Sequence, residues 1–221
     1  MGCPIDLVVN KCAGSFLLTK PHRIQEMVTA SSNVISCPLT FKTRTGFFDG
    51  KNVSRDIILK SPQWGAAAVT LHGRTRQQRY TKQADWKYIY DCGNSIVEKF
   101  SLEGDKCEDE RDFHLIGNGD IYSYEDFNRH MKSISLENDE GAADELSRRS
   151  ISTVMIARGA LIKPWLFREI KEQRHIDISS GERFDLIKEF VNYGLQHWGC
   201  DSKGVETTRR FLLEWMGFLH R

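Results

Sequence analysis

The sequence lacks any hydrophobic run long enough to span a bilayer. Its apolar opening, MGCPIDLVVNKCAGSFLL, is short, has no basic stretch before it, and contains Asp6 and Asn10. These features are poor ones for a signal peptide or a membrane anchor. We therefore expect an intracellular protein of the cytoplasm, the nucleus or both, with no membrane partner.

The sequence also lacks the spacing of a cysteine-rich metal site. Its six cysteines include no C-x-x-C pair, and no histidine doublet of zinc-site spacing lies near them. We expect reduced thiols and no structural metal. The cysteines are Cys3, Cys12, Cys37, Cys92, Cys107 and Cys200.

The net charge is only +1, but the charge is unevenly distributed. Residues 97–145 hold 15 acidic and 5 basic residues, whereas the rest of the chain holds 26 basic and 15 acidic residues. A positive body with a separate acidic segment suits a polyanionic partner. Plain surface solvation is the alternative explanation.

Four apolar stretches alternate with helical patterns, which predicts a parallel sheet. The strands are expected within 33–46, 65–76, 113–121 and 151–161, and the helices within 53–63, 84–100, 123–134 and 164–173. Ser54 and Ser123 mark helix starts, and Pro164 lies in a first turn. Two amphipathic helices follow, over 184–199 and 205–221.

Each predicted strand ends in small, polar or charged residues. The carboxyl ends of parallel strands share one edge, where α/β folds build active sites. This edge would carry Lys42, His72, Asn118, Asp120 and Arg158. The acidic stretches 101–112 and 135–149 precede strands and are expected as solvated loops on the opposite face.

Several of these residues also have a purely structural explanation. The turns LIGNGDI and VMIARGAL suit a phosphate group, or are ordinary tight turns. Lys42 is either a cation directed at a ligand or a surface residue, and His72 is either a ligand contact or a core histidine. Cys3, in a Gly-Cys-Pro turn, is a general acid or a small buried residue.

Five stretches in order resemble the tRNA dihydrouridine synthases. They are GCPIDLV, LTFKTRTG, VTLHGRTRQQRYTKQADW, LIGNGDI and VMIARGALIKPWLF. The resemblance runs from Gly2 to Phe167 and continues more weakly into the helical tail. It is closest to the eukaryotic subfamily that modifies the variable-loop uridine at tRNA position 47.

The resemblance implies an FMN-containing (β/α)₈ barrel with a C-terminal helical domain that helps to hold RNA. Cys3 would be the catalytic acid, and Lys42 and His72 would contact the flavin. Ala157, Cys12 and Ala13 stand where glycine is common in the family. The phosphate end of FMN would be held by Asn118, Gly119, Asp120, Ala157, Arg158 and Gly159.

The implied reaction reduces the C5–C6 double bond of a uridine in tRNA. NADPH reduces FMN, a hydride passes from the flavin to C6, and Cys3 protonates C5, while a cationic Lys42 stabilises the reduced ring. Arg74, Arg76 and Arg79 would follow the tRNA backbone, and messenger RNA stays open as a further partner. A small-molecule FMN barrel oxidoreductase and an inactive RNA-binding fragment are the alternatives.

In that family the Gly-Cys-Pro turn follows the fourth barrel strand. We therefore expect the C-terminal part of a longer enzyme whose other part carries strands one to four and a CCCH zinc-finger region. The fold would be α/β, with the C-terminal half of a (β/α)₈ TIM barrel over 1–175 and a small all-α, RNA-binding region over 176–221. An isolated half-barrel has open sheet edges, so it should bind FMN poorly and aggregate.

Overall fold

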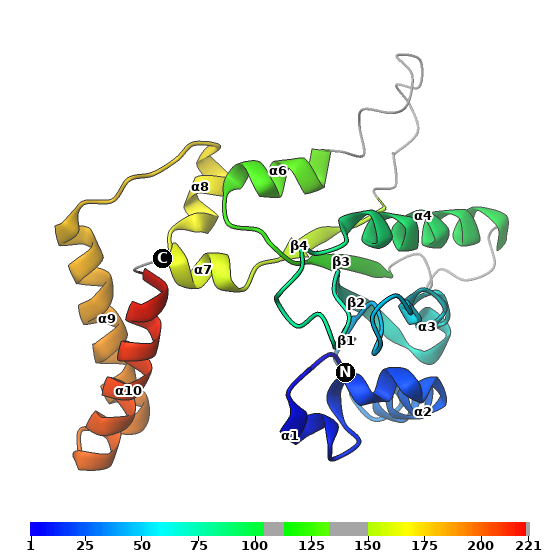
Figure 1. Cartoon of the computed structure of the whole chain (residues 1–221), viewed down its shortest axis with the longest axis horizontal. Coiled ribbons are helices and arrows are strands. Elements are labelled where there is room, and N and C mark those ends of the chain that lie inside the picture. Colours follow the sequence, from blue (N-terminus) through cyan, green and yellow to red (C-terminus); the bar gives the residue numbers. More distant parts are fainter. Residues whose placement is uncertain (104–112, 133–149, 220–221) are drawn as a thin grey trace. The chain divides into compact units, whose positions relative to one another are not determined.

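A computed structural model describes residues 1–103, 113–132 and 150–219 of the chain (Figure 1). It divides into two compact units. The first comprises Met1–Asp120 and Asn128–Met155, and the second comprises Ile121–Phe127 and Ile156–Arg221. Much of the predicted acidic loops, together with residues 220–221, lies outside the described residues.

The first unit combines a sheet with helices. Its elements are α1 (Asp6–Val9), η1 (Gly14–Thr19), α2 (Pro21–Ser32), β1 (Leu39–Arg44), α3 (Ser54–Lys60), η2 (Pro62–Trp64), β2 (Ala66–His72), α4 (Trp86–Glu103), β3 (His114–Asn118) and β4 (Thr153–Met155). The strands lie in the order β1-β2-β3-β4, and all the pairs are parallel. The predicted α/β class and parallel sheet are confirmed.

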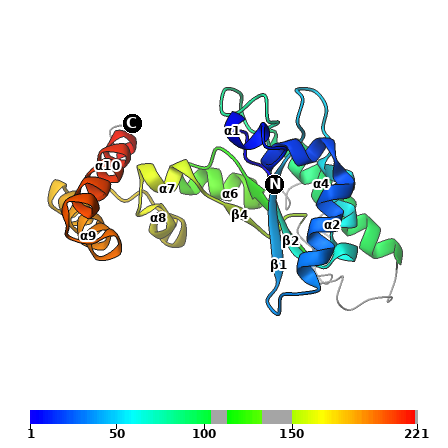
Figure 2. The ribbon, with the colours of Figure 1, turned by 90° about the horizontal axis from the view of Figure 1, so that it is seen from below.

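The two faces of this sheet differ in chemistry because side chains alternate along a strand. Val69, Leu71 and Leu115 are buried on one face. A Cβ atom at Gly117, on the same face, would lie 2.4 Å from the ring of Trp86 in α4. Helices α2 and α4 lie on one side of β1 and β2 (Figure 2). The polar side chains at the strand ends therefore lie on the other face of the sheet.

The strands are shorter than the apolar stretches that predicted them. Pro38 lacks an N–H donor for the ladder, and β1 begins directly after it. The stretch expected as a strand over 151–161 is a strand only over Thr153–Met155, and a helix begins at Arg158. The expected fourth strand is therefore confirmed but short, because the second half of the stretch forms a helix that its Ala and Leu residues favour.

Local rules account for most helices in the first unit. Helix α3 begins at Ser54, as predicted, but the Ser54 hydroxyl contacts the Tyr88 hydroxyl at 3.3 Å and does not cap the helix. Helix α2 was not expected from the sequence. It begins with Pro21 and buries Ile24 and Val28, which lie four residues apart on one face.

The second unit is helical. Its elements are α7 (Arg158–Ile162), α8 (Leu166–Glu172), α9 (Ser180–Trp198) and α10 (Ser202–Leu219), and α6 (Tyr124–Lys132) belongs partly to each unit. The backbone N–H of Asp126 donates to the Ser123 hydroxyl at 3.1 Å, so the predicted cap of α6 is confirmed. Ser179 and Glu182 form a capping box at the start of α9.

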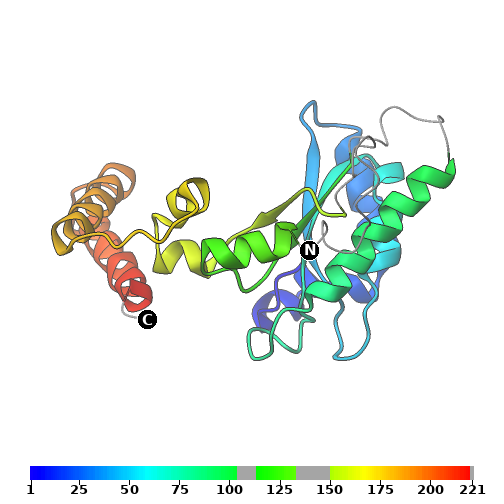
Figure 3. The ribbon, with the colours of Figure 1, turned by 90° about the horizontal axis from the view of Figure 1, so that it is seen from above.

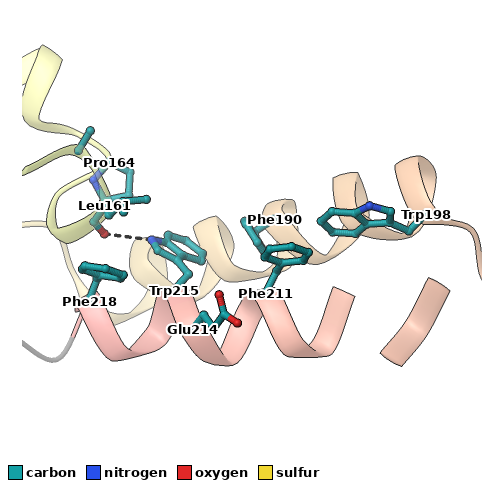
Figure 4. A pocket seen from close by; sticks show the side chains of 9 residues that line it. Leu161, Pro164, Phe190, Trp198, Phe211, Glu214, Trp215 and Phe218 are labelled. Atoms are coloured by element: carbon teal, nitrogen blue, oxygen red, sulfur yellow. Dashed lines mark hydrogen bonds between the residues drawn. The ribbon is translucent and has the colours of Figure 1, made fainter. Parts of the chain in front are cut away.

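Helices α9 and α10 run side by side (Figure 3) and pack through aromatic pairs. Trp198 stacks on Phe211 with ring centroids 4.9 Å apart, and Phe190 lies 4.9 Å from Trp215. The indole N–H of Trp215 donates to the Leu161 carbonyl at 3.0 Å. Together with α7, these helices line an apolar pocket of about 490 Å³ (Figure 4). None of the predicted site residues lines this pocket. No described helix is long and apolar enough to cross a membrane.

Candidate active site at the strand ends

The last residues of the four strands form one row across the sheet. Arg44 pairs in register with His72, His72 with Asn118, and Asn118 with Met155. Lys42 lies two residues before Arg44 and so on the same face. The predicted meeting of Lys42, His72 and Asn118 at one sheet edge is therefore present in the structure.

Lys42 and Asn118 are joined directly. The Lys42 ammonium donates to Asn118 Oδ1 at 2.7 Å, and Asn118 Nδ2 donates to the Met155 carbonyl at 2.7 Å. Burial, and secondarily the positive charge of Arg44, lower the pKa of Lys42 to about 8. Lys42 therefore carries its positive charge at neutral pH in a partly desolvated position.

Two hydrogen bonds to backbone carbonyls, one of Gly2 and one of Cys3 itself, hold Cys3 near this edge. The Arg44 Nε–H donates to the Gly2 carbonyl at 2.9 Å, and the Ser15 N–H donates to the Cys3 carbonyl at 3.0 Å. A Cβ atom at Gly14 would lie 2.7 Å from the Cys3 carbonyl oxygen, so the loop needs glycine there. These contacts fix the Cys3 backbone beside the carboxyl end of β1.

Arg44 is a site residue that sequence reasoning missed. Its side chain is buried, and besides Gly2 it donates to the carbonyls of Thr75 and Arg79 at 3.0 and 3.1 Å. One guanidinium therefore joins the segment that carries Cys3 to the loop after β2. Its position two residues after Lys42, on the same strand face, was the available signal.

The turn after β3 takes a backbone shape that favours glycine. Gly119 has φ +135° and Asp120 has φ +50°. The Trp86 indole N–H donates to the Gly119 carbonyl at 3.1 Å, and a Cβ atom at Gly119 would lie 2.5 Å from the Ala84 side chain. Ala84, which precedes α4, and Trp86, the first residue of α4, therefore determine the path of this turn.

Arg74 occupies the space between β2 and this turn. Its Nη2 donates to both carboxylate oxygens of Asp120, at 2.7 and 2.8 Å, and its Nη1 contacts His72 Nε2 at 3.2 Å. The Ala84 N–H donates to the same carboxylate at 2.8 Å. Because the Arg74 side chain is only 3% exposed, it does not fit the expected contact with RNA phosphates.

Comparison with known proteins shows the family of the chain. The family model for dihydrouridine synthase (Dus) matches residues 1–212. The chain belongs to the dihydrouridine synthase family. It is therefore similar to its relatives over both units.

Curated relatives of the dihydrouridine synthase family match the whole chain. Proteins named tRNA-dihydrouridine(47) synthase [NAD(P)(+)]-like are 54% identical in rice (Oryza sativa subsp. japonica), 52% in Arabidopsis thaliana and 47% in Homo sapiens, each over 221 residues. The chain spans 28% of the rice and Arabidopsis proteins and 29% of the human protein.

Arg76 and Arg79, the other two expected RNA contacts, have more exposed side chains, at 22% and 51%. Both pair with Asp6 of α1, whose carboxylate accepts from Arg76 at one oxygen and from Arg79 at the other. These contacts lower the pKa of Asp6, most strongly through the hydrogen bond from Arg79. Their predicted role in RNA binding stays a prediction.

Three further residues that the family resemblance assigns to the phosphate site lie in the second unit. Ala157 precedes α7, and Arg158 and Gly159 are its first residues. The Arg158 guanidinium lies 5.5 Å from the ring centre of Tyr122. A Cβ atom at Gly159 would lie 2.2 Å from the Ile121 carbonyl oxygen, so packing alone requires glycine there. Their phosphate contacts stay predictions.

Proposed function

We propose that this chain is part of a tRNA-dihydrouridine synthase that reduces a tRNA uridine, at position 47, with FMN as hydride carrier and NADPH as reductant. Family membership and the names of the relatives support the reaction class. The hydrogen bond from Arg44 to the Gly2 carbonyl carries the proposal, because it holds Cys3 beside the strand ends that bear Lys42 and His72.

The four-stranded sheet would be the C-terminal half of a (β/α)₈ barrel. In such a barrel the helices cover the outside, and the carboxyl ends of the strands carry the active site. The first unit follows that rule, with apolar side chains toward the helices and Lys42, Arg44 and His72 on the other face. The region 1–175 would form the barrel part, and 176–221 a helical part that holds RNA.

The residues at the strand ends fit FMN. Lys42 is a partly buried cation, which suits a ring that gains negative charge on reduction. Gly119 and Asp120 form a turn of positive φ directly after β3, at the strand end where α/β folds bind phosphate groups. When bound, the flavin supplies the hydride for C6 of the uracil. The residues of the chain would then bind the flavin, orient the uracil and protonate its C5 atom.

Cys3 would give its proton to C5 of the uracil. A thiol carries a proton that it can donate to a reacting carbon, which is the role of a general acid. The thiolate left after proton transfer would lie in the field of Arg44, whose buried guanidinium interacts electrostatically with Cys3. Arg44 would therefore orient the segment and stabilise the negative sulfur.

The proposal is tested in a chimera in which this chain replaces the matching segment of the rice relative. The chimera, with FMN and NADPH, is incubated with tRNA from a strain that makes no dihydrouridine, and dihydrouridine is measured by mass spectrometry. We expect product from the chimera and a loss of at least about 100-fold with Cys3→Ala, because general acids contribute roughly 10²–10⁴-fold.

Cys12→Ala is the matched control, because Cys12 is an exposed cysteine nine residues away on the same segment. It should leave the rate unchanged. A Cys3→Ala chimera that keeps its activity would contradict the assignment of Cys3 as the acid. A chimera that binds FMN but never modifies tRNA would contradict the proposed reaction.

A further inference from the structure

We propose that Arg74 is a positioning residue that holds His72 as the neutral tautomer with its proton on Nδ1. The contact between Arg74 Nη1 and His72 Nε2, at 3.2 Å, carries this inference. It rests on the proposed function only for its consequence in catalysis, because the tautomer can be measured without any activity.

The direction of this hydrogen bond follows from the chemistry of the two groups. A guanidinium has five N–H donors and no acceptor. Arg74 therefore donates, and His72 Nε2 must accept with its lone pair. A neutral imidazole with a lone pair on Nε2 carries its proton on Nδ1. In water, the free histidine side chain favours the opposite tautomer, so the protein must impose this one.

Arg74 is held too firmly to turn away from His72. Its Nη2 pairs with both oxygens of Asp120, and its Nε donates to the Lys82 carbonyl. The three nitrogens of one planar guanidinium are thus fixed by three separate segments of the chain. Burial of the side chain, at 3% exposure, excludes competition from bulk water.

The charges around His72 disfavour an imidazolium. A proton on Nε2 would place a second positive charge against the Arg74 guanidinium at the same contact. Arg44, the partner of His72 in the β1–β2 register, adds another cation. Asp120 is engaged by Arg74, and the Tyr80 ring lies 6.5 Å from the His72 ring. These groups favour a neutral His72.

The tautomer decides what His72 can do at the active site. A neutral imidazole with Nδ1–H can donate one hydrogen bond to an acceptor atom of a ligand, and it is a very weak acid. His72 would therefore orient the ligand and would not supply the proton for C5. That role is left to Cys3, as the proposed function requires.

The tautomer is read from the ring nitrogen shifts of the chimera with the rice relative, labelled with ring-¹⁵N histidine. The long-range ¹H–¹⁵N spectrum distinguishes a protonated ring nitrogen from one with a lone pair, and His72→Gln assigns the His72 signal among those of the other histidines. We expect a lone pair on Nε2 and a proton on Nδ1 at pH 7.

The decisive variant is Arg74→Met/Asp120→Asn, which removes both charges of this partly buried pair and so leaves no unpaired carboxylate. We expect its His72 signal to shift to the tautomer with the proton on Nε2. Arg76→Gln is the matched control, because it removes a cation of the same loop that pairs with Asp6, and it should leave His72 unchanged.

The outcomes separate the two proposals. A proton on Nε2 of His72 in the unsubstituted chimera would overturn the role of Arg74. So would a His72 signal that does not change in the double variant while the signals of the other histidines stay in place. An inactive chimera with the expected His72 tautomer would instead count against the proposed function alone.

Discussion

The ammonium of Lys42 reaches across β2 to the side-chain oxygen of Asn118 on β3, at 2.7 Å. Lys42 pairs in register with Thr70, and Asn118 pairs with His72, so the side chain passes over the strand between them. Asn118 is itself fixed by its bond to the Met155 carbonyl. The cation therefore has a set position before any ligand binds.

Stability should depend on pH through Lys42. Its pKa is about 8 in the folded chain, against an ordinary value of 10.5. Between these values the unfolded chain holds more protons, so the contribution of Lys42 to the free energy of unfolding rises with pH. Relative to Lys42→Met, the unsubstituted chain should gain about 2 kcal/mol between pH 7 and pH 9.5 in urea unfolding.

Lys51→Met controls for the loss of one positive charge, because Lys51 is an exposed lysine. A difference between the chain and Lys42→Met that stays constant from pH 7 to 9.5 would contradict the partly desolvated position of Lys42.

The sheet could be predicted because most of its strands lie in short, largely apolar runs that Gly or Pro residues flank. The runs ending in Lys42-Thr43-Arg44 and in His72 are of this kind, and the row of strand ends follows from parallel pairing. Helix α2 offered a weaker signal, since only Ile24 and Val28 are buried along it. A stripe of two residues does not reveal a helix in a single sequence.

The burial of Arg74 could not be predicted. An arginine in the run HGRTRQQR indicates a basic surface, and its actual partner, Asp120, lies 46 residues away along the chain. Only the folded turn at Gly119 brings that carboxylate beside β2. The sequence thus indicated which residues meet at the strand ends, but not which of them bind each other.

The loop that holds Cys3 should not tolerate a side chain at Gly14. Gly14→Ala combines a φ of +60° with a Cβ atom 2.7 Å from the Cys3 carbonyl and 2.9 Å from Val8. Gly50→Ala is the matched control, since it has φ +72° and no atom within 4 Å of the new Cβ. Gly50→Ala should cost about 1 kcal/mol, and Gly14→Ala roughly 1–3 kcal/mol more, in urea unfolding.

Gly14→Ala should also change how fast Cys3 reacts with a thiol reagent, because the clash moves its backbone. Equal stability losses for the two alanine variants, with unchanged Cys3 reactivity, would show that the loop does not position the thiol.

RNA binding should depend on Arg76 and Arg79, the two arginines paired with Asp6. Each phosphate contact contributes roughly 0.7–0.9 to the slope of log affinity against log salt. In the chimera, Arg76→Ala/Arg79→Ala should weaken tRNA binding and reduce that slope by about 1 to 2. Arg23→Ala, an exposed arginine on α2, is the control. Unchanged affinity and slope in the double variant would exclude these arginines from the RNA interface.

The last prediction separates packing from phosphate binding at Gly159. Gly159→Ala would place a Cβ atom 2.2 Å from the Ile121 carbonyl oxygen and 3.1 Å from Leu166, so the backbone must move, and we expect a loss of about 1–3 kcal/mol. Gly181→Ala, whose new Cβ approaches only Ser179 at 3.8 Å within α9, should gain up to about 1 kcal/mol. If Gly159→Ala instead keeps full stability and weakens only FMN binding, this glycine serves ligand approach and the packing explanation is wrong.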